Sequence, residues 1–246
     1  MINKPYYRIY RPNKQDDSNK YIMDDRYCSI RLDLVRYYKT LERDFLKTLE
    51  YIELTDDNLS TYSINNYKLL TNICIEVENN LKGILLANNY INVDRNRDLT
   101  MKDYSVLYKY LRLTEYTVEL KVFYYQKKLN PFIRGKDKQL KWYKAYNKLK
   151  HDRTKNIKYA TLDNIINALA GLYILIYSQF YLYSDCTSDK CNTYFQVQYG
   201  VMNNFNSSSI FEVKQTPLWN NDEMYDFNWE NIKNTIKAFD KLNIYN

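Results

Sequence analysis

The sequence predicts a mainly all-α protein, an antiparallel helical bundle with small β or irregular appendages at both ends. Only four glycines and four prolines occur in 246 residues, so few positions break a helix. Over several long stretches, apolar residues recur at three- and four-residue steps, the spacing of a helix with one buried face. Polar, less regular sequence lies outside them. We therefore divide the chain into an extension at 1–27, a bundle at 28–184 and an appendage at 185–246.

Two long helices are expected in the first half of the bundle. The first runs from Cys28 to about Leu54, where a polar run at 55–60 ends it. The second runs from Ser63 to about Asn89 and matches a 3.6-residue period closely. The apolar stripe of the first is Ile30, Leu34, Tyr37/Tyr38, Leu41, Phe45, Leu49 and Ile52, and that of the second is Tyr67, Leu70, Cys74, Val77, Leu81, Ile84 and Leu85.

The middle of the chain is less regular. Thr100 or Asp103 can cap a third helix that extends to about Leu113. Residues 117–126 alternate apolar and polar side chains, which fits either a strand or a continuation of the helix. The Asn-Pro dipeptide at 130–131 then predicts a loop.

Two further helices complete the predicted bundle. One runs from Lys138 to His151, and the other begins after Thr161 and is nearly continuously apolar or aromatic from Ile165 to Tyr183. That length approaches the roughly 20 residues of a membrane span. Interspersed Asn, Ser and Gln and several tyrosines make it less lipid-like, so we interpret it as the buried central helix of the bundle and expect no membrane association.

The appendage after residue 184 has a different pattern. Residues 193–201 and 209–215 alternate as short strands do, and an Asn- and Ser-rich stretch separates them. Residues 229–242 have the pattern of a short helix.

The charge balance permits a nucleic-acid partner. The net charge is +7, which favours contact with phosphates because lysines and arginines displace their counterions. Lys, Asn, Ile and Tyr are also encoded by A/T-rich codons, so genome composition alone explains the same balance. Both explanations stay open, and a site is needed to choose between them.

No cofactor or metal is expected. Cys28 and Cys74 fall inside helical patterns, Cys186 and Cys191 lie five apart in a polar loop, and a single histidine argues against a zinc site. A Gly-rich phosphate loop is missing from the sequence, which disfavours a nucleotide-dependent enzyme of small molecules. The first residues lack the apolar segment of a signal peptide, so we expect a cytoplasmic protein.

One stretch carries side chains suited to chemistry on RNA. Asn147 and His151 are four residues apart, so on a helix they lie one turn apart on the same face, and Arg153 follows. Imidazole exchanges protons near neutral pH, and a guanidinium can hold a phosphate with two parallel hydrogen bonds. We predict His151 as general acid–base, Asn147 as positioning residue and Arg153 as phosphate ligand. The expected substrate-binding residues are Lys150, Lys148 and Tyr146.

A structural explanation competes with this one. Lys, Arg and His are common in the last turn of a helix, where the helix dipole favours positive charge. In that case His151 contributes to folding rather than to chemistry.

The stretch resembles the signature of HEPN domains, helical bundles found in many bacterial toxin and phage-defence (abortive-infection) proteins. Their motif is Arg, a polar residue that is often Asn, three variable residues and His. Asn147 takes the polar position and His151 the last, whereas Tyr146 replaces the Arg and Arg153 is the nearest cation that could compensate. Residues 73–85 and 160–172 resemble neighbouring helices of this family, so the resemblance covers about 28–184.

The resemblance implies a homodimer in which two motifs face a shared cleft and cleave RNA without a metal. Members without the Arg can be catalytically inactive modules for dimerisation, partner binding or RNA binding, so Tyr146 keeps that alternative open. An antitoxin or other partner protein is also expected for a toxin.

Two carboxylates are further candidates. Glu76 and Glu78 lie beside the apolar stripe of the second helix, where a carboxylate could orient His151 or neutralise Arg153; an ordinary solvated flank is the alternative.

Overall fold

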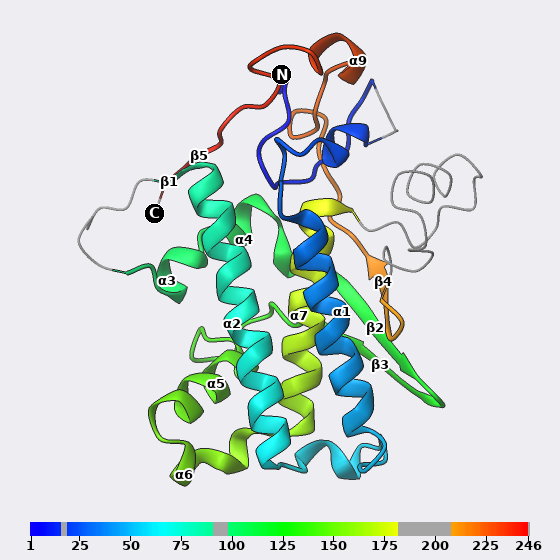
Figure 1. The fold of residues 1–246 in the computed structure, drawn as a ribbon, viewed down its shortest axis with the longest axis vertical. Helices are drawn as coiled ribbons and strands as arrows, with labels where there is room; N and C mark the ends of the chain where they lie inside the picture. Colours follow the sequence, from blue (N-terminus) through cyan, green and yellow to red (C-terminus); the bar gives the residue numbers. More distant parts are fainter. Residues whose placement is uncertain (16–18, 91–97, 182–207, 246) are drawn as a thin grey trace.

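Three long helices form the centre of the protein, as a computed structural model shows (Figure 1). The structure describes residues 1–15, 19–90, 98–181 and 208–245. The long helices are α1 (Arg31–Thr48), α2 (Ile64–Ala87) and α7 (Leu162–Phe180). All three were predicted; α1 is several residues shorter than expected at both ends, whereas α2 agrees within two residues.

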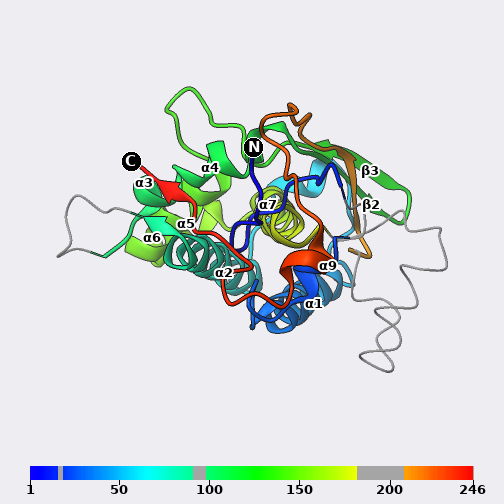
Figure 2. The same cartoon turned by 90° about the horizontal axis from the view of Figure 1, so that it is seen from above.

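Helix α7 lies in the middle of the molecule, with α1 and α2 on one side and the strands on the other (Figure 2). Its apolar side chains are buried all round, which matches the nearly continuous apolar sequence. At Gly171 an added Cβ would lie 3.3 Å from the ring of Trp142, so the glycine allows close packing of the shorter helix α5 (Lys141–His151). Of the helices in the described ranges, none is both long and apolar enough to cross a membrane.

The predicted third helix is broken into short turns. Thr100 and Asp103 form a reciprocal capping box that starts α3 (Met101–Tyr104), as the sequence suggested. The chain then continues through α4 (Leu107–Tyr110) and the 3-10 turn η3 (Leu113–Glu115). Arg112 takes a left-handed backbone conformation with φ of 51°, and this prevents one continuous helix.

An antiparallel three-stranded sheet covers another side of α7, and it makes the all-α prediction wrong. Strand β2 (Thr117–Val122) lies between β3 (Tyr125–Leu129) and β4 (Phe211–Gln215). The described residues form a mixed α/β structure, with about 49% of them in helices, 13% in strands, and two small sheets. The physical reason is that β2 pairs with β3 and β4, so that every second residue of the alternating segment is buried against the core and the segment forms a strand rather than extending the helix.

The terminal segments pack against each other at the upper end of the bundle in Figure 1. The backbone of Tyr225 forms isolated β-bridges with Ile2 and with Asn13. The Tyr225 hydroxyl donates to the carbonyl of Ile9 at 2.7 Å. The second sheet pairs β1 (Asn89–Tyr90) with β5 (Asn243–Ile244) in parallel. Smaller elements of this end are η1 (Lys20–Met23) and α9 (Trp229–Ile232).

The three predictions for the appendage have different outcomes. The helix predicted at 229–242 is limited to α9, because residues 233–242 leave the helical path to bring Ala238 and Phe239 into the core. The strand predicted at 209–215 is present as β4, whereas the one at 193–201 lies outside the described residues.

A buried arginine fixes the amino-terminal segment to the bundle. Arg8 Nε donates to Gln179 Oε1 at 2.9 Å, and Arg8 Nη2 donates to Asn80 Oδ1 at 3.4 Å. Burial lowers the pKa of Arg8. The guanidinium occupies the space above Gly83, where an added Cβ would lie 2.0 Å from Arg8 Nη1. This glycine is therefore required by a close approach rather than by backbone conformation.

Candidate nucleic-acid interface

The predicted site lies at the corner where α5 meets α6 (Arg153–Asn156), which is followed by the 3-10 turn η4 (Ile157–Tyr159), at the lower left of Figure 1. Asp152 leaves the helical path with φ of −152° and ψ of 88°, and its side chain accepts from the backbone N–H of Lys155. The amide of Asn156 donates to the carbonyls of Lys148, at 3.0 Å, and Asp152, at 2.9 Å. These bonds satisfy groups that the two helix ends leave open and so fix the corner.

Helix α5 is anchored through its aromatic face. Trp142 is fully buried and donates from its indole Nε1 to the carbonyl of Pro131 at 2.9 Å. The hydroxyl of Tyr143 donates to Glu78 Oε1, on α2, at 2.6 Å. Burial, and then the bond to Glu78, raise the pKa of Tyr143 well above its ordinary value. Since this face points into the bundle, the opposite face of α5 is open to a ligand.

His151 and Asn147 lie one turn apart on α5, as predicted. His151 is exposed and Asn147 is half-buried. Within the described ranges, neither side chain takes part in a hydrogen bond or ion pair with another residue. Asn147 therefore does not hold the imidazole of His151 by a hydrogen bond in this structure.

Two cations at the corner lie over two tyrosine rings. The guanidinium carbon of Arg153 is 5.9 Å from the ring centroid of Tyr67, on α2, and the ammonium of Lys150 is 5.7 Å from that of Tyr146. Both distances fall within the range of cation–π attraction. Neither Lys150 nor Arg153 forms an ion pair with a carboxylate in the described part of the chain.

Tyr146, expected to bind substrate, is instead a core residue with 3% exposure. Burial raises its pKa to about 12, and the nearby Glu78, Cys74 and Tyr67 add to the shift. The ring of Tyr146 makes the cation–π contact with the ammonium of Lys150 that is described above. This chain therefore has an uncharged ring at the position where the HEPN motif has Arg. Arg153, on α6, lies over the ring of Tyr67, and Tyr67 lies near Tyr146.

The two carboxylates proposed to orient the site have other partners. Glu78 accepts from Tyr143, as described above. Glu76 accepts from Asn80 Nδ2 at 2.9 Å, and burial raises its pKa while the bonds to Asn79 and Asn80 and the charge of Arg8 oppose the shift. In the described ranges, neither contacts His151 or Arg153 through an ion pair or hydrogen bond. Glu78 positions α5, and Glu76 belongs to the Arg8 network.

Positive charge is concentrated around the corner. Residues 134–158 contain ten Lys and Arg against two Asp, a net charge of +8, whereas the whole chain carries +7. The rest of the chain is thus close to neutral. All ten cations are exposed except Lys148, which is half-buried. A uniform codon bias spreads lysine along the chain, so this clustering favours a polyanionic partner. The total charge of the chain does not reveal this cluster, whereas the net charge of a window of about 25 residues does.

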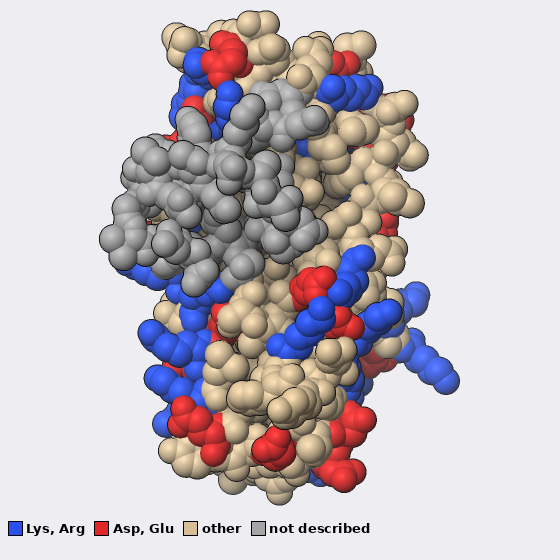
Figure 3. All heavy atoms as spheres, turned by 90° about the vertical axis from the view of Figure 1, so that its right-hand side faces the viewer, with Lys and Arg blue, Asp and Glu red and all other residues tan. Residues whose placement is uncertain are grey.

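The opposite side of the molecule differs. The sheet side faces the viewer in Figure 3, where Lys and Arg lie beside Asp and Glu. There Lys121 is paired with Glu119 and Glu212, and Lys214 with the same two carboxylates. Mixed charge of this kind gives a polyanion little net attraction.

Comparison with known proteins gives no family assignment. A scan against protein-family models found no match, and searches of curated proteins and of solved structures found no significant similarity. The resemblance to HEPN domains stays a prediction from the motif residues.

Proposed function

We propose that the α5–α6 corner binds the sugar–phosphate backbone of RNA and that a homodimer of this chain cleaves it without a metal, as part of a toxin or phage-defence system. The observation that supports this most is the exposed His151, whose side chain forms no hydrogen bond with another described residue and which lies in the sequence between the exposed cations Lys150 and Arg153. The site lies within the segment that holds the excess positive charge of the chain.

The chemistry uses side chains of this chain only. The neutral imidazole of His151 takes the proton of a ribose 2′-hydroxyl, and the 2′-oxygen attacks the adjacent phosphorus. The bond from phosphorus to the 5′-oxygen breaks, which leaves a 2′,3′-cyclic phosphate. Arg153 and Lys150 neutralise the charge that develops on the phosphate oxygens. The leaving 5′-oxygen needs a proton, and since each chain has one histidine, His151 of the second copy supplies it.

A second candidate is an RNA- or partner-binding module without catalysis. The observation that favours it is the burial of Tyr146 at the Arg position of the motif, together with the missing hydrogen bond from Asn147 to His151. A general acid–base works best when a neighbouring group fixes the imidazole.

An RNA-cleavage assay separates the two candidates. Purified protein is incubated with end-labelled RNA and excess EDTA, beside His151→Ala and Arg153→Gln. The proposal expects fragments ending in cyclic phosphate from the native protein, loss of at least about 100-fold for His151→Ala, in line with general acid–base catalysis, and weaker RNA binding for Arg153→Gln. If the native protein binds RNA but His151→Ala cleaves as well as it does, the catalytic role is wrong. Binding without cleavage by any variant supports the module.

A further inference from the structure

Four side chains form a stripe along α5. Lys141, Lys144, Lys148 and His151 follow at steps of three, four and three residues, so they share one face of the helix. Ten residues of α-helix span about 15 Å, a length over which several phosphates of a strand can be contacted. The predicted site residues include only the end of this stripe, Lys148 and His151.

The stripe faces away from the core. The buried residues of α5 are Trp142, Ala145, Tyr146 and Leu149, none of which belongs to it. Lys141 and Lys144 are exposed, like His151, and Lys148 is half-buried. At the amino-terminal end of α5 the preceding loop adds three more exposed cations, Arg134, Lys136 and Lys138.

Weak ion pairs occupy two of the lysines. Lys141 Nζ lies 2.8 Å from Asp163, and Lys144 Nζ lies 2.5 Å from Asp137. The Lys144 ammonium lowers the pKa of the Asp137 carboxyl. Both lysines are exposed, although the Asp163 side chain is only 19% exposed, and ion pairs at the surface add little to stability, so a phosphate can compete with either carboxylate.

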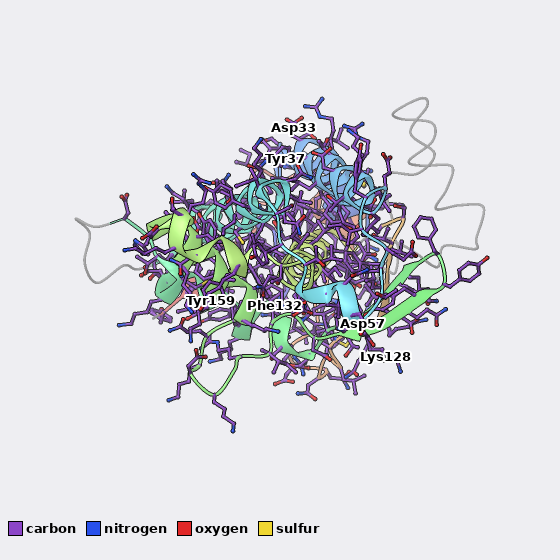
Figure 4. The ribbon with its side chains drawn as sticks, turned by 90° about the horizontal axis from the view of Figure 1, so that it is seen from below. Asp33, Tyr37, Asp57, Lys128, Phe132 and Tyr159 are labelled. Atoms are coloured by element: carbon purple, nitrogen blue, oxygen red, sulfur yellow. The ribbon has the colours of Figure 1, made fainter. Side chains whose placement is uncertain are left out.

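An aromatic ring lies beside the stripe. Lys148 Nζ is 3.9 Å from the ring centroid of Tyr159, and this ammonium lowers the pKa of the tyrosine. Tyr159 is half-exposed in the turn after α6, and Figure 4 shows it on the α5–α6 side of the molecule, across from Lys128 of β3. A ring next to a row of cations is the arrangement on which single-stranded nucleic acids stack their bases.

We propose that the face formed by Lys141, Lys144, Lys148 and Tyr159 holds a single-stranded RNA that extends from His151 toward the loop at 134–138. This inference rests on the proposed function and names its substrate class, a strand that fills the length of α5 rather than a mononucleotide or a duplex end. Stacking on Tyr159 requires unpaired bases, and the cations follow one line, as a single backbone does.

The test compares strand lengths and salt dependence. Dissociation constants are measured at several salt concentrations for a 4-nucleotide and a 16-nucleotide 2′-O-methyl RNA, which cannot be cleaved. The test variant is Lys141→Gln/Lys144→Gln. The control is Lys121→Gln/Lys214→Gln, which removes two exposed, ion-paired lysines of the sheet side. The 16-mer is expected to bind the native protein at least about tenfold more tightly than the 4-mer.

In the test variant the slope of log affinity against log salt for the 16-mer falls by about 1.4, the value for two lost contacts with single-stranded phosphates. The control variant keeps the native slope. The 4-mer binds at His151, so its dissociation constants for the native protein and the two variants differ by less than about twofold. Three results would each refute the proposed binding of an RNA strand along α5: equal affinity of the native protein for both lengths, an unchanged slope in the test variant, or competition by polyglutamate equal to that by RNA. Failure of the native protein to bind any RNA would instead refute the proposed function itself.

Discussion

The guanidinium of Arg153 lies 5.9 Å from the centre of the Tyr67 ring, so a residue early in α2 supports a cation of α6. Tyr67 is half-buried, and its phenol also lies near Tyr146, the residue beneath Lys150. Two rings from two helices therefore hold the two cations that flank His151.

The Tyr67 contact predicts a graded effect on RNA binding. An exposed cation–π contact contributes about 0.5–1 kcal/mol, so Tyr67→Leu, which keeps apolar bulk without the ring, weakens RNA binding about two- to fivefold. Tyr67→Phe keeps the ring and is expected to bind like the native protein. Fluorescence anisotropy with labelled RNA measures both. Equal loss in both variants would show that the hydroxyl, not the ring, is what matters.

Gly83 is expected to be intolerant of a side chain. Gly83→Ala places a Cβ 2.0 Å from Arg8 Nη1, so the guanidinium loses its place and its bonds to Gln179 and Asn80. Since hydrogen bonds to a charged group contribute about 1.5–3 kcal/mol, we expect the free energy of unfolding to fall by at least about 2 kcal/mol. Urea denaturation measures it. Gly135→Ala, in an exposed loop, is the control and changes stability by less than about 0.5 kcal/mol.

Tyr146 makes stability sensitive to alkaline pH. Its pKa is raised to about 12 in the folded protein, against about 10 in an unfolded chain. A raised folded pKa gives a stabilising contribution that is complete below pH 10 and is lost as pH rises to 12. Tyr146→Phe removes the ionisable group, so its stability falls less steeply across this window. Parallel chemical denaturation at pH 9, 10 and 11 tests this; identical slopes would contradict it.

The long helices could be predicted from the sequence because their evidence is local. In α2, apolar residues return every three or four positions over 24 residues, and Ser63 accepts from the N–H of Asn66 as an N-cap should. The strand at 209–215 was predicted as well, but its pairing with β2 was not, since β2 has only six residues and β4 comes from the far end of the chain. Six alternating residues fit a strand or a helix edge equally well until pairing decides between them.

The site was predictable in part for the same reason. The spacing of Asn147 and His151 placed them on one turn because a helix is a local structure. The burial of Tyr146 could have been predicted too, because Trp142, Ala145, Tyr146 and Leu149 recur at the spacing of one buried helix face. The position of the Tyr67 ring beside Arg153 depends on how α2 lies against α6, and no local pattern encodes that packing.

The most direct test of RNA contact uses the single histidine of the chain. Its imidazole Hε1 proton gives one histidine signal in the NMR spectrum, which is followed while a 2′-O-methyl RNA is added at constant pH. Contact at the α5–α6 corner predicts a saturable shift of this signal, at the same RNA concentration that saturates anisotropy. Saturable binding of RNA with an unmoved His151 signal would place the RNA elsewhere and contradict the proposed site.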